Sequence, residues 1–530
     1  MGENIFFWKV FGRRTLICFF LMSTLFLSCI LRIATICKND YTNVSLEQNF
    51  YKYEIATLRG TIYDRNMIPL TNNIKRKVAI VPPTPRAITS ISKVLDVDNL
   101  TNILNTLQKG NPVICDFEKE INIDGILYTE VYETDMTNIN HIIGYCDKNG
   151  NGLTGLQKAY DNFLNSNEKL TCIYEVDAKG KILEGVNPSL NYNDSTIENG
   201  IITTIDYHLQ NISEKYADSI EKGAIVIADA KTSEILASVS RPKINFNDQT
   251  NVNSQYLNRA INAYSVGSVF KPCVAIAGIE NNQSGFIYNC TGKCEIIDRV
   301  FKCHEQNGHG ETNLKKGLAN SCNTFFYNYS FNIGAEQIYN TAKNLLFGKS
   351  IILCDGIRTA KGNLPNINTL ENKANLANFS IGQGELTLSP ISMITLYSAI
   401  ANDGLYHPPS IVKATLTNGK IDRKNPDNPI RAMKKDTSDK IKEYLKDVLD
   451  NGTGIAAKPK NTTAAGKTAT AQTGKFQNGR EICSGWFCGF FPYENPKYVV
   501  IIFSEDISLQ TKTCSEIFAN IADEISDKYN

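Results

Sequence analysis

The chain has 530 residues, and its 55 basic side chains nearly balance its 54 acidic ones. A near-neutral charge argues against a nucleic-acid-binding surface, and this length predicts two or more domains. No internal repeat is visible, and no long run of Pro, Gly or Ser marks a linker.

The N-terminal segment predicts a membrane anchor. Residues 15–31 are apolar apart from small hydroxyl residues and two cysteines. With residues 33–37 the run reaches roughly the 20 residues that a bilayer crossing requires. Lys9, Arg13 and Arg14 precede this run, which predicts a cytoplasmic N-terminus and an exported remainder.

We therefore assign residues 1–14 to a cytoplasmic tail and residues 15–36 to a transmembrane anchor. A cleavable signal peptide begins in the same way, but no small-x-small cleavage site follows convincingly. Residues 26–29 (FLSC) faintly resemble a lipoprotein site, with phenylalanine as an unfavourable lead residue. An uncleaved anchor is the favoured interpretation.

A domain boundary is predicted near residue 200, because residues 191–195 and 198–200 are rich in turn-forming residues. Residues 37–200 then form a first region and residues 201–530 a second one. Residues 203–206 open a helical stretch of the second region.

The second region predicts an α+β domain. Its strand-like runs, which alternate with helical segments, cover residues 223–229, 233–240, 464–473, 484–491 and 498–504. The chain ends in an amphipathic helix over residues 515–529.

Ser268 and Lys271 stand three residues apart at the start of a predicted helix. Pro272 is tolerated only near a helix start, and small apolar residues follow at 273–277. Positions i and i+3 share one face of a helix, so the two side chains can meet. A lysine activates a serine hydroxyl only when the lysine pKa falls. Burial, or a second cation such as Lys467, lowers that pKa.

Cysteines are frequent for an exported chain, with 15 in total. One cluster contains Cys290, Cys294, Cys303, His304 and His309. These residue types bind zinc, but their spacing fits no standard zinc module. A disulfide such as Cys290 to Cys303 is a competing use in an oxidising compartment. Free or structural thiols are the third and favoured interpretation.

Ser321 and Asn323 lie between a predicted helix over residues 314–319 and an aromatic run over residues 325–327, so we expect a turn between two helices. A hydroxyl can relay a proton, and an amide can hold a peptide group. Alone, each such motif is compatible with an ordinary helix cap. Their ordered combination indicates chemistry.

Residues 467–471 (KTATA) alternate as a strand, with Lys467 on one face and Thr468 and Thr470 on the other. A strand that borders a cleft can pair with an extended peptide. The GKT sequence here also suggests a phosphate-binding P-loop. Asn461 stands where that motif requires glycine, so this alternative is excluded.

The ordered SxxK, SxN and KTA motifs resemble those of the class B penicillin-binding proteins, membrane-anchored D,D-transpeptidases that crosslink peptidoglycan. Further segments resemble this family along most of the chain. They are residues 59–66 (RGTIYDRN), 141–145 (HIIGY), 152–157 (GLTGLQ), 223–227 (GAIVI), 234–238 (EILAS), 380–385 (SIGQGE) and 484–492 (SGWFCGFFP).

The resemblance implies an α+β protein with an N-terminal transmembrane helix. An elongated non-catalytic pedestal or dimerisation domain would cover residues 37–200. A penicillin-binding transpeptidase domain, with a five-stranded antiparallel sheet flanked by helices, would cover residues 201–530.

The resemblance also implies a bacterial cell-membrane protein whose catalytic domain lies outside the cytoplasm. Stem peptides ending in D-Ala-D-Ala would be its substrates, β-lactams its inhibitors and a membrane glycosyltransferase its partner. No metal, organic cofactor or nucleic acid is implied.

Carried over residue by residue, the resemblance makes Ser268 the nucleophile that forms an acyl-enzyme and Lys271 its base. Ser321 would complete the proton path to the leaving amine. Asn323 would position the acyl-side peptide of the substrate.

The same resemblance gives Lys467 the role of supplying positive potential. Backbone N–H groups of Ser268 and Thr470 would form the oxyanion hole. The hydroxyls of Thr468 and Thr470 would hold the terminal carboxylate.

Two residues depart from the family pattern. Ala469 stands where the third motif usually ends in glycine, and its methyl group can crowd a substrate or a β-lactam. We therefore expect acylation with altered β-lactam kinetics. Gln157 stands where the family usually has glutamate. Because it lies outside the catalytic domain, we expect it to affect packing or partner contacts.

Three functions remain open, of which an active transpeptidase is favoured. The second is a catalytically weak homologue that serves as a scaffold or regulator for a glycosyltransferase partner, an alternative that Ala469 raises. The third is a β-lactam sensor or serine β-lactamase. The long N-terminal region argues against the third, because β-lactamases are typically a single catalytic domain.

Overall fold

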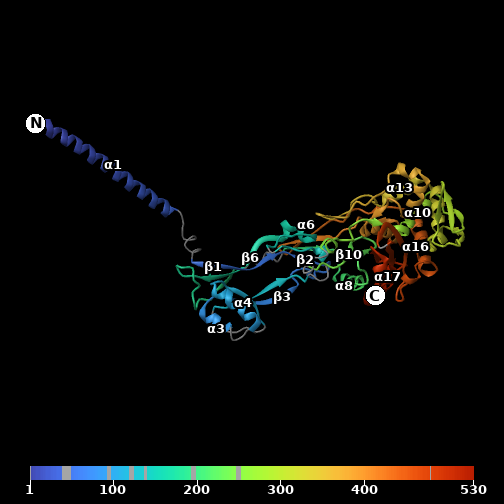
Figure 1. Cartoon of the computed structure of the whole chain (residues 1–530), viewed down its shortest axis with the longest axis horizontal. Coiled ribbons are helices and arrows are strands. Elements are labelled where there is room, and N and C mark those ends of the chain that lie inside the picture. Colours follow the sequence, from blue (N-terminus) through green and yellow to red (C-terminus); the bar gives the residue numbers. More distant parts are fainter. Residues whose placement is uncertain are drawn as a thin grey trace. The chain divides into compact units, whose positions relative to one another are not determined.

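The computed structural model describes residues 2–38, 49–91, 97–117, 125–135, 140–147, 149–191, 199–245, 252–477 and 479–529 (Figure 1). The chain forms two compact units, each discontinuous in sequence. The first comprises Met1–Ala56, Arg76–Val131 and Lys169–Asn193, and the second Thr57–Lys75, Tyr132–Glu168 and Asp194–Asn530. The boundary predicted near residue 200 falls partly on residues 192–198, outside the described residues, and stays a prediction.

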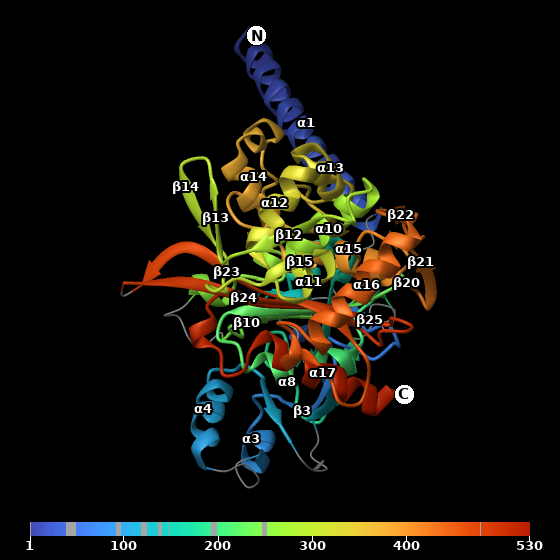
Figure 2. The same ribbon diagram turned by 90° about the vertical axis from the view of Figure 1, so that its right-hand side faces the viewer.

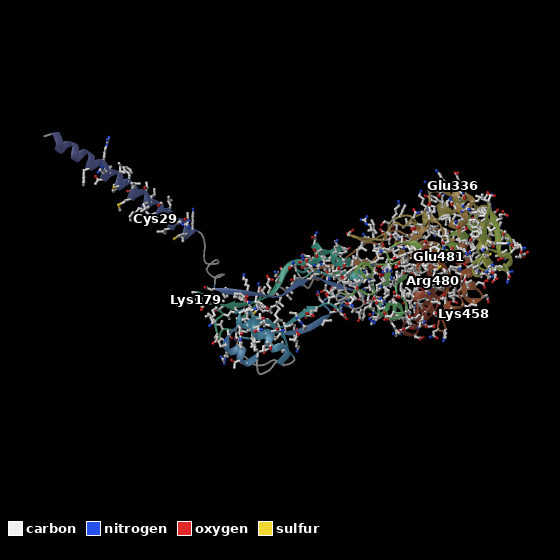
Figure 3. The ribbon with its side chains drawn as sticks, viewed as in Figure 1. Cys29, Lys179, Glu336, Lys458, Arg480 and Glu481 are labelled. Atoms are coloured by element: carbon white, nitrogen blue, oxygen red, sulfur yellow. The ribbon has the colours of Figure 1, made fainter. Side chains whose placement is uncertain are left out.

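The N-terminal helix α1 (Gly2–Lys38) is long and apolar enough, over Phe11–Lys38, to cross a membrane. Its large apolar side chains are exposed to the surroundings, and Cys29 also projects from it (Figure 3). Exposed apolar side chains are unfavourable in water but favourable in the hydrocarbon core of a bilayer. The anchor predicted over residues 15–36 lies within this helix.

Two three-stranded sheets are built largely from the first unit. One has the order β1-β6-β7, from β1 (Phe50–Arg59), β6 (Asn165–Glu175) and β7 (Ser189–Asn191); the other has the order β4-β3-β5, from β3 (Ile74–Val81), β4 (Val113–Asp116) and β5 (Leu127–Glu133). Helices α3 (Pro85–Ile91) and α4 (Val97–Gln108) contribute to a small core with this second sheet. Val81, Ala87 and Leu107 are buried in it.

A four-stranded sheet of the second unit joins distant parts of the chain. Its order is β2-β8-β20-β21, from β2 (Thr61–Tyr63), β8 (Gly200–Thr203), β20 (Val412–Thr417) and β21 (Lys420–Arg423). Strands β2 and β8 are parallel, and the other pairs are antiparallel. The segment near residue 60 is therefore part of the same unit as the C-terminal half.

Arg59 and Gln157 hold two short segments of the second unit together. Arg59 Nε donates to Gln157 Oε1 at 2.5 Å, and Nη2 donates to the Gln157 carbonyl at 2.7 Å. Asp161 pairs with Nη1 at 2.8 Å. Helices α6 (Gly155–Ala159) and α7 (Asp161–Leu164) carry these partners. Gln157 is buried, which agrees with the expected effect on packing; the expected effect on partner contacts stays a prediction.

The main sheet has five strands in the order β10-β9-β25-β24-β23, and every neighbouring pair is antiparallel. The strands are β9 (Gly223–Asp229), β10 (Ile235–Arg241), β23 (Ala465–Gln477), β24 (Arg480–Phe491) and β25 (Tyr498–Ser504). The predicted α+β class and five-stranded antiparallel sheet are confirmed. Strand β23 lies at an edge of the sheet, which leaves one side of its backbone open for pairing.

Helices cover both faces of this sheet (Figure 2). Helices α8 (Tyr207–Ala217) and α17 (Cys514–Tyr529) pack on one face, and α15 (Pro390–Ala401) packs on the other. All residues of α15 are buried, as expected for a helix between a sheet and an outer helical layer. Helix α17 confirms the helix predicted over residues 515–529.

The other elements of the second unit are further helices, single turns and short two-stranded ladders. The helices are α5 (Asn140–Ile143), α9 (Val252–Gln255), α10 (Lys271–Glu280), α11 (Leu314–Ala319), α12 (Asn323–Ile333), α13 (Ala335–Asn344), α14 (Lys373–Ser380) and α16 (Lys435–Asp450), with single turns η2 (Gly267–Phe270), η3 (Ile367–Glu371), η4 (Ile455–Ala457) and η5 (Ile507–Leu509). The ladders pair β11 (Tyr264–Ser265) with β18 (Thr387–Leu388), β12 (Ile287–Cys290) with β15 (Gly310–Asn313), β13 (Lys293–Ile296) with β14 (Arg299–Lys302), β16 (Ile352–Cys354) with β17 (Ile357–Arg358), and β19 (Leu405–Tyr406) with β22 (Ile430–Arg431).

A buried ion pair ties helix α8 to the end of β10. Arg241 Nη1 lies 2.7 Å from Glu214 Oε2, and Arg241 Nη2 donates to the Glu214 carbonyl at 2.7 Å. Both side chains are almost completely buried. Arg241 Nη2 also pairs with the exposed carboxylate of Asp218 at 2.8 Å, so loss of Glu214 would leave the buried guanidinium only partly compensated.

Replacing Glu214 by Ala should lower stability by about 1–3 kcal/mol, a drop of a few degrees in melting temperature, because Arg241 keeps only its exposed partner Asp218. Thermal unfolding of the full chain in detergent measures this shift. The control is Glu443→Ala, because Glu443 forms an exposed pair with Lys315 at 2.8 Å and its loss should change stability by less than about 1 kcal/mol. Equal melting temperatures for the two variants would contradict the expected role of burial.

Candidate active site

Ser268 lies in a tight turn directly before helix α10. The turn is η2, and α10 begins at Lys271 with Pro272 in its first turn. Proline is tolerated there because the first N–H groups of a helix have no partner within it. The helix start predicted from Ser268 and Pro272 is confirmed. Ser268 itself is half-buried, whereas Val269 is buried.

Gly267 allows this turn to approach strand β23 closely. Its φ is +62°, a conformation that favours glycine, and its N–H donates to the Gly382 carbonyl at 2.9 Å. A Cβ at this position would lie 3.1 Å from Ala471 Cβ and 3.3 Å from the Thr470 carbonyl oxygen. The turn that carries Ser268 is thereby fixed against both β23 and the 380–385 segment.

Lys271 is completely buried and is held by oxygen acceptors from the next motif. Its Nζ donates to the Ser321 carbonyl at 2.6 Å, to Ser321 Oγ at 3.1 Å and to Asn323 Oδ1 at 2.8 Å. The Phe326 ring lies 5.3 Å from the same nitrogen. Burial lowers the pKa of Lys271 to about 7, because a charged ammonium is penalised without water. The fall in pKa expected from the sequence is confirmed.

Ser321 occupies the predicted turn between α11 and α12. Its φ is +52°, which costs a non-glycine residue about 1–2 kcal/mol. Backbone bonds hold the turn: Ser321 N–H donates to the Leu318 carbonyl at 3.2 Å and Cys322 N–H to the Gly317 carbonyl at 2.9 Å. In this turn both oxygens of Ser321 reach Lys271.

Lys467 also lies inside the protein, on strand β23. Lys467, Ala469 and Ala471 are buried while Thr468 and Thr470 are more exposed, so the predicted alternation is confirmed. Burial, followed by the nearby charge of Lys271, lowers the pKa of Lys467 well below its ordinary value. Simultaneous positive charges on Lys271 and Lys467 are therefore unfavourable.

A pocket of about 530 Å³ lies in front of these groups. Its lining includes six of the eight residues predicted for the site, namely Ser268, Ser321, Asn323, Thr468, Ala469 and Thr470. The two lysines lie behind this wall, fully buried.

The pocket also contains residues that the sequence reasoning missed. Thr453 Oγ1 lies 3.1 Å from Thr468 Oγ1 and 3.5 Å from Lys467 Nζ. Trp486 lines the pocket and donates its indole N–H to a backbone carbonyl at 3.0 Å. The turn-forming sequence at 451–454 (NGTG), just after an amphipathic helix, was a signal for Thr453.

Ala469 places its methyl group between the strand and the Ser268 turn. A Cβ on Gly267 would stand 3.4 Å from Ala469 Cβ, and Ala469 forms part of the pocket wall. The methyl group thus narrows the site beside the nucleophile.

These features together suit acyl transfer. A lysine that is neutral near pH 7 can take a hydroxyl proton. Ser268 lines the pocket three residues before that lysine in the chain, and an edge strand that forms one pocket wall can pair with an extended peptide.

Comparisons with known proteins agree with this chemistry. A model of the penicillin binding protein transpeptidase domain matches residues 223–527. Stage V sporulation protein D of Bacillus subtilis is 26% identical over 485 residues, covering 84% of this chain and 73% of that protein. Peptidoglycan D,D-transpeptidase MrdA of Acinetobacter baumannii is 26% identical over 553 residues, covering 88% and 80%.

Solved structures share the fold. Penicillin binding protein 3 of Mycobacterium tuberculosis, complexed with aztreonam, has a TM-score of 0.65 at 21% identity and covers 89% of this chain and 96% of that one. A peptidoglycan synthetase of Bifidobacterium adolescentis has a TM-score of 0.66 at 17% identity and covers 91% and 97%.

Proposed function

Because this chain belongs to the family of penicillin-binding protein transpeptidases, we propose that it is a class B peptidoglycan D,D-transpeptidase that forms an acyl-enzyme on Ser268. One observation carries the proposal: the buried Lys271, held by Ser321 and Asn323 behind a pocket that Ser268 lines. Relatives that carry the D,D-transpeptidase name over most of the chain support it.

The reaction has two acyl transfers. Lys271 takes the Ser268 proton, and the Ser268 oxygen attacks the carbonyl of the penultimate D-alanine of a donor stem peptide. The C–N bond breaks, the last D-alanine leaves, and its amine receives a proton through Ser321. The amine of a second stem peptide then attacks the acyl-enzyme, forms the crosslink and restores the Ser268 hydroxyl.

Strand β23 holds the donor peptide. Thr468 and Thr470 bind its terminal carboxylate, and Asn323 positions the acyl-side amide. Backbone N–H groups of Ser268 and Thr470 stabilise the oxyanion, where one such donor typically contributes about 100- to 1,000-fold in rate. The carboxylate of the substrate also favours a charged Lys467, whose ammonium then supplies positive potential.

The apolar part of helix α1 anchors the enzyme in the cell membrane, with the basic residues Lys9, Arg13 and Arg14 at the start of the same helix inside the cell and the catalytic unit outside. Peptidoglycan strands lie on that outer side. A membrane glycosyltransferase is the natural partner, because it produces the glycan strands that carry the stem peptides.

A co-purification assay tests this partner. The glycosyltransferase should co-purify with the wild-type chain, and it should be lost when α1 is replaced by an unrelated membrane anchor.

Labelling with a fluorescent penicillin that does not cross membranes tests the nucleophile. Intact cells that make the wild-type chain should be labelled, and Ser268→Ala should lower labelling by at least about 1,000-fold. Ser284→Ala is the control, because Ser284 is exposed in the turn after α10 and outside the pocket. Persistent labelling of Ser268→Ala would refute the assignment of Ser268, and rapid loss of the label from the wild type would favour a β-lactamase.

Crosslinking of lipid-linked substrate separates an active transpeptidase from a weak homologue. We expect the wild-type chain to form crosslinked product and Ser268→Ala to form none. A wild-type chain that binds penicillin stably but never crosslinks would favour the scaffold alternative.

The pH dependence of acylation tests Lys271 as the base. Lys271 must be neutral to accept a proton, and Lys467 must be charged to supply positive potential. The rate should therefore rise with pH through about 7 and fall at higher pH as Lys467 loses its proton. Lys467 on β23 and the thiols of Cys322 and Cys303 are the titratable groups that face Lys271. Stopped-flow acylation by a β-lactam measures the profile. A rate that still rises steeply above pH 9 would indicate a lysine with an ordinary pKa.

Removing the Ala469 methyl group tests the departure from the family motif. Ala469→Gly should accelerate acylation by bulky β-lactams severalfold, because it widens the pocket next to Gly267. Ala465→Gly is a matched control, since Ala465 lies on the same strand, is buried and does not line the pocket. Identical acylation rates for wild type and Ala469→Gly would show that the methyl group is tolerated without effect.

A further inference from the structure

Three cysteines and one histidine meet beside the SxN motif. Single ligand atoms of Cys290, Cys303, His309 and Cys322 all lie within 4.8 Å of one another. The sequence cluster had suggested three of these residues. The fourth, Cys322, is the residue between Ser321 and Asn323, and only the fold brings it to the other three.

We propose that these four residues form a structural zinc site that positions the SxN motif of the active site. The proposal goes beyond the acyl-transfer function, because the site would bind its ion whether or not the enzyme crosslinks peptidoglycan.

Three of the six separations between ligand atoms are close to those of tetrahedral coordination, and all six are within 4.8 Å. An ion with Zn–S bonds of about 2.3 Å and a Zn–N bond of about 2.0 Å holds its ligand atoms roughly 3.5–3.8 Å apart. His309 Nδ1 lies 3.6 Å from Cys290 Sγ and 3.6 Å from Cys303 Sγ, and the sulfurs of Cys303 and Cys322 lie 3.9 Å apart. A disulfide would require a separation of about 2.05 Å, and all of these cysteines are free.

The donor set favours zinc over other ions. Three thiolates and one imidazole form a Cys₃His site, which is typical of structural zinc. Each thiol that binds loses its proton to solvent. Cys290, Cys303 and Cys322 are buried and His309 is half-buried, so the site is closed and leaves no open position for a catalytic water.

Neighbouring groups support the ligands. Thr324 Oγ1 donates to Cys290 Sγ at 3.0 Å, and a hydrogen bond of this kind orients a metal ligand and moderates its charge. Cys303 N–H donates to the Gly292 carbonyl at 2.8 Å. Gly292 and Gly308 have positive φ values of 87° and 80°. A Cβ on Gly308 would collide with the Cys290 carbonyl, so glycine is required where the two loops meet.

The four ligands come from three separate segments of the chain, because Cys303 and His309 share the loop between β14 and β15. Cys290 ends β12, Cys303 follows β14, His309 precedes β15 and Cys322 precedes α12. An ion at this point crosslinks the region of the short ladders β12–β15, called the hairpin region below, to the start of α12. Cys294 belongs to the sequence cluster but lies on β13, outside the four-residue group.

The link to catalysis runs through Cys322. Its two neighbours supply all three oxygen acceptors that hold Lys271 Nζ, and Ser321 is kept at a φ of +52°. A bond between zinc and the Cys322 thiolate would fix the backbone of Cys322, which links the acceptors on Ser321 and Asn323. Cys322 is therefore a positioning residue, and the ion does not touch the substrate.

Metal content of the full chain tests the site. Protein purified in detergent with reduced thiols should contain one zinc ion per chain by elemental mass spectrometry. Cys303→Ala and His309→Ala should lose most of it, while the control Cys294→Ala, in the same hairpin region, should keep it. Wild-type protein without stoichiometric metal, or with a disulfide among these cysteines by thiol titration, would overturn the proposal.

Cobalt substitution answers the same question without any variant. After removal of zinc by a chelator, Co²⁺ should give the thiolate charge-transfer band and the intense visible bands of tetrahedral cobalt, saturating at one equivalent. The weak bands of octahedral aqueous cobalt alone would overturn the site even if the variants fail to fold.

Acylation measured on the same samples tests the positioning role. Wild-type protein from which a chelator has removed the zinc should be acylated by fluorescent penicillin at least about tenfold more slowly than zinc-loaded protein, and added zinc should restore the rate. An unchanged rate in metal-free protein that retains its melting temperature would overturn the positioning role of Cys322. If zinc-loaded protein is never acylated, the proposed function fails while the metal site stands.

Discussion

The contact on which the site depends is the bond between the Lys271 ammonium and the oxygens of Ser321 and Asn323. A lysine without access to water is costly to charge, and here three acceptors offset part of that penalty. Burial lowers the pKa to about 7, against the opposing effect of the Cys322 and Cys303 thiols, and so places the amine between a permanent cation and a permanently neutral group. A base that must take and return a proton in one turnover requires this intermediate position.

Two constraints keep this contact in place. On one side, Gly267 lets the Ser268 turn lie against β23, because its φ of +62° favours glycine and a Cβ there would be crowded by the strand. On the other, a non-glycine residue in the left-handed region turns the chain between α11 and α12. Such strain persists only where the surroundings hold it firmly. The edge strand β23 then completes the site, because its alternation buries Lys467 and leaves Thr468 and Thr470 toward the substrate.

Local patterns were sufficient for much of this arrangement. Strands β9 and β25 coincide with runs visible in the sequence, because a strand covered on both faces is continuously apolar. The positions of Ser268, Lys271 and Lys467 followed from helix and strand periodicity together with the ordered motifs. The contact between Arg59 and Gln157 did not follow, because it joins residues 98 positions apart. Thr453 was missed for the same reason, since its role depends on which strand its loop approaches.

Cys322 shows most clearly why sequence spacing was insufficient. Cysteines and histidines are close in the chain over residues 290–309, but their spacing matches no standard zinc-binding module. The fourth ligand atom comes from beyond strand β15 and helix α11, inside a motif that was already assigned to catalysis. One residue can serve both sites because its backbone and its side chain point to different neighbours. The backbone of Cys322 joins Ser321 and Asn323, whose oxygens accept from Lys271, while its thiol points to Cys303. A metal bond on the thiol side therefore resists the same relaxation of the Ser321 turn that would release Lys271.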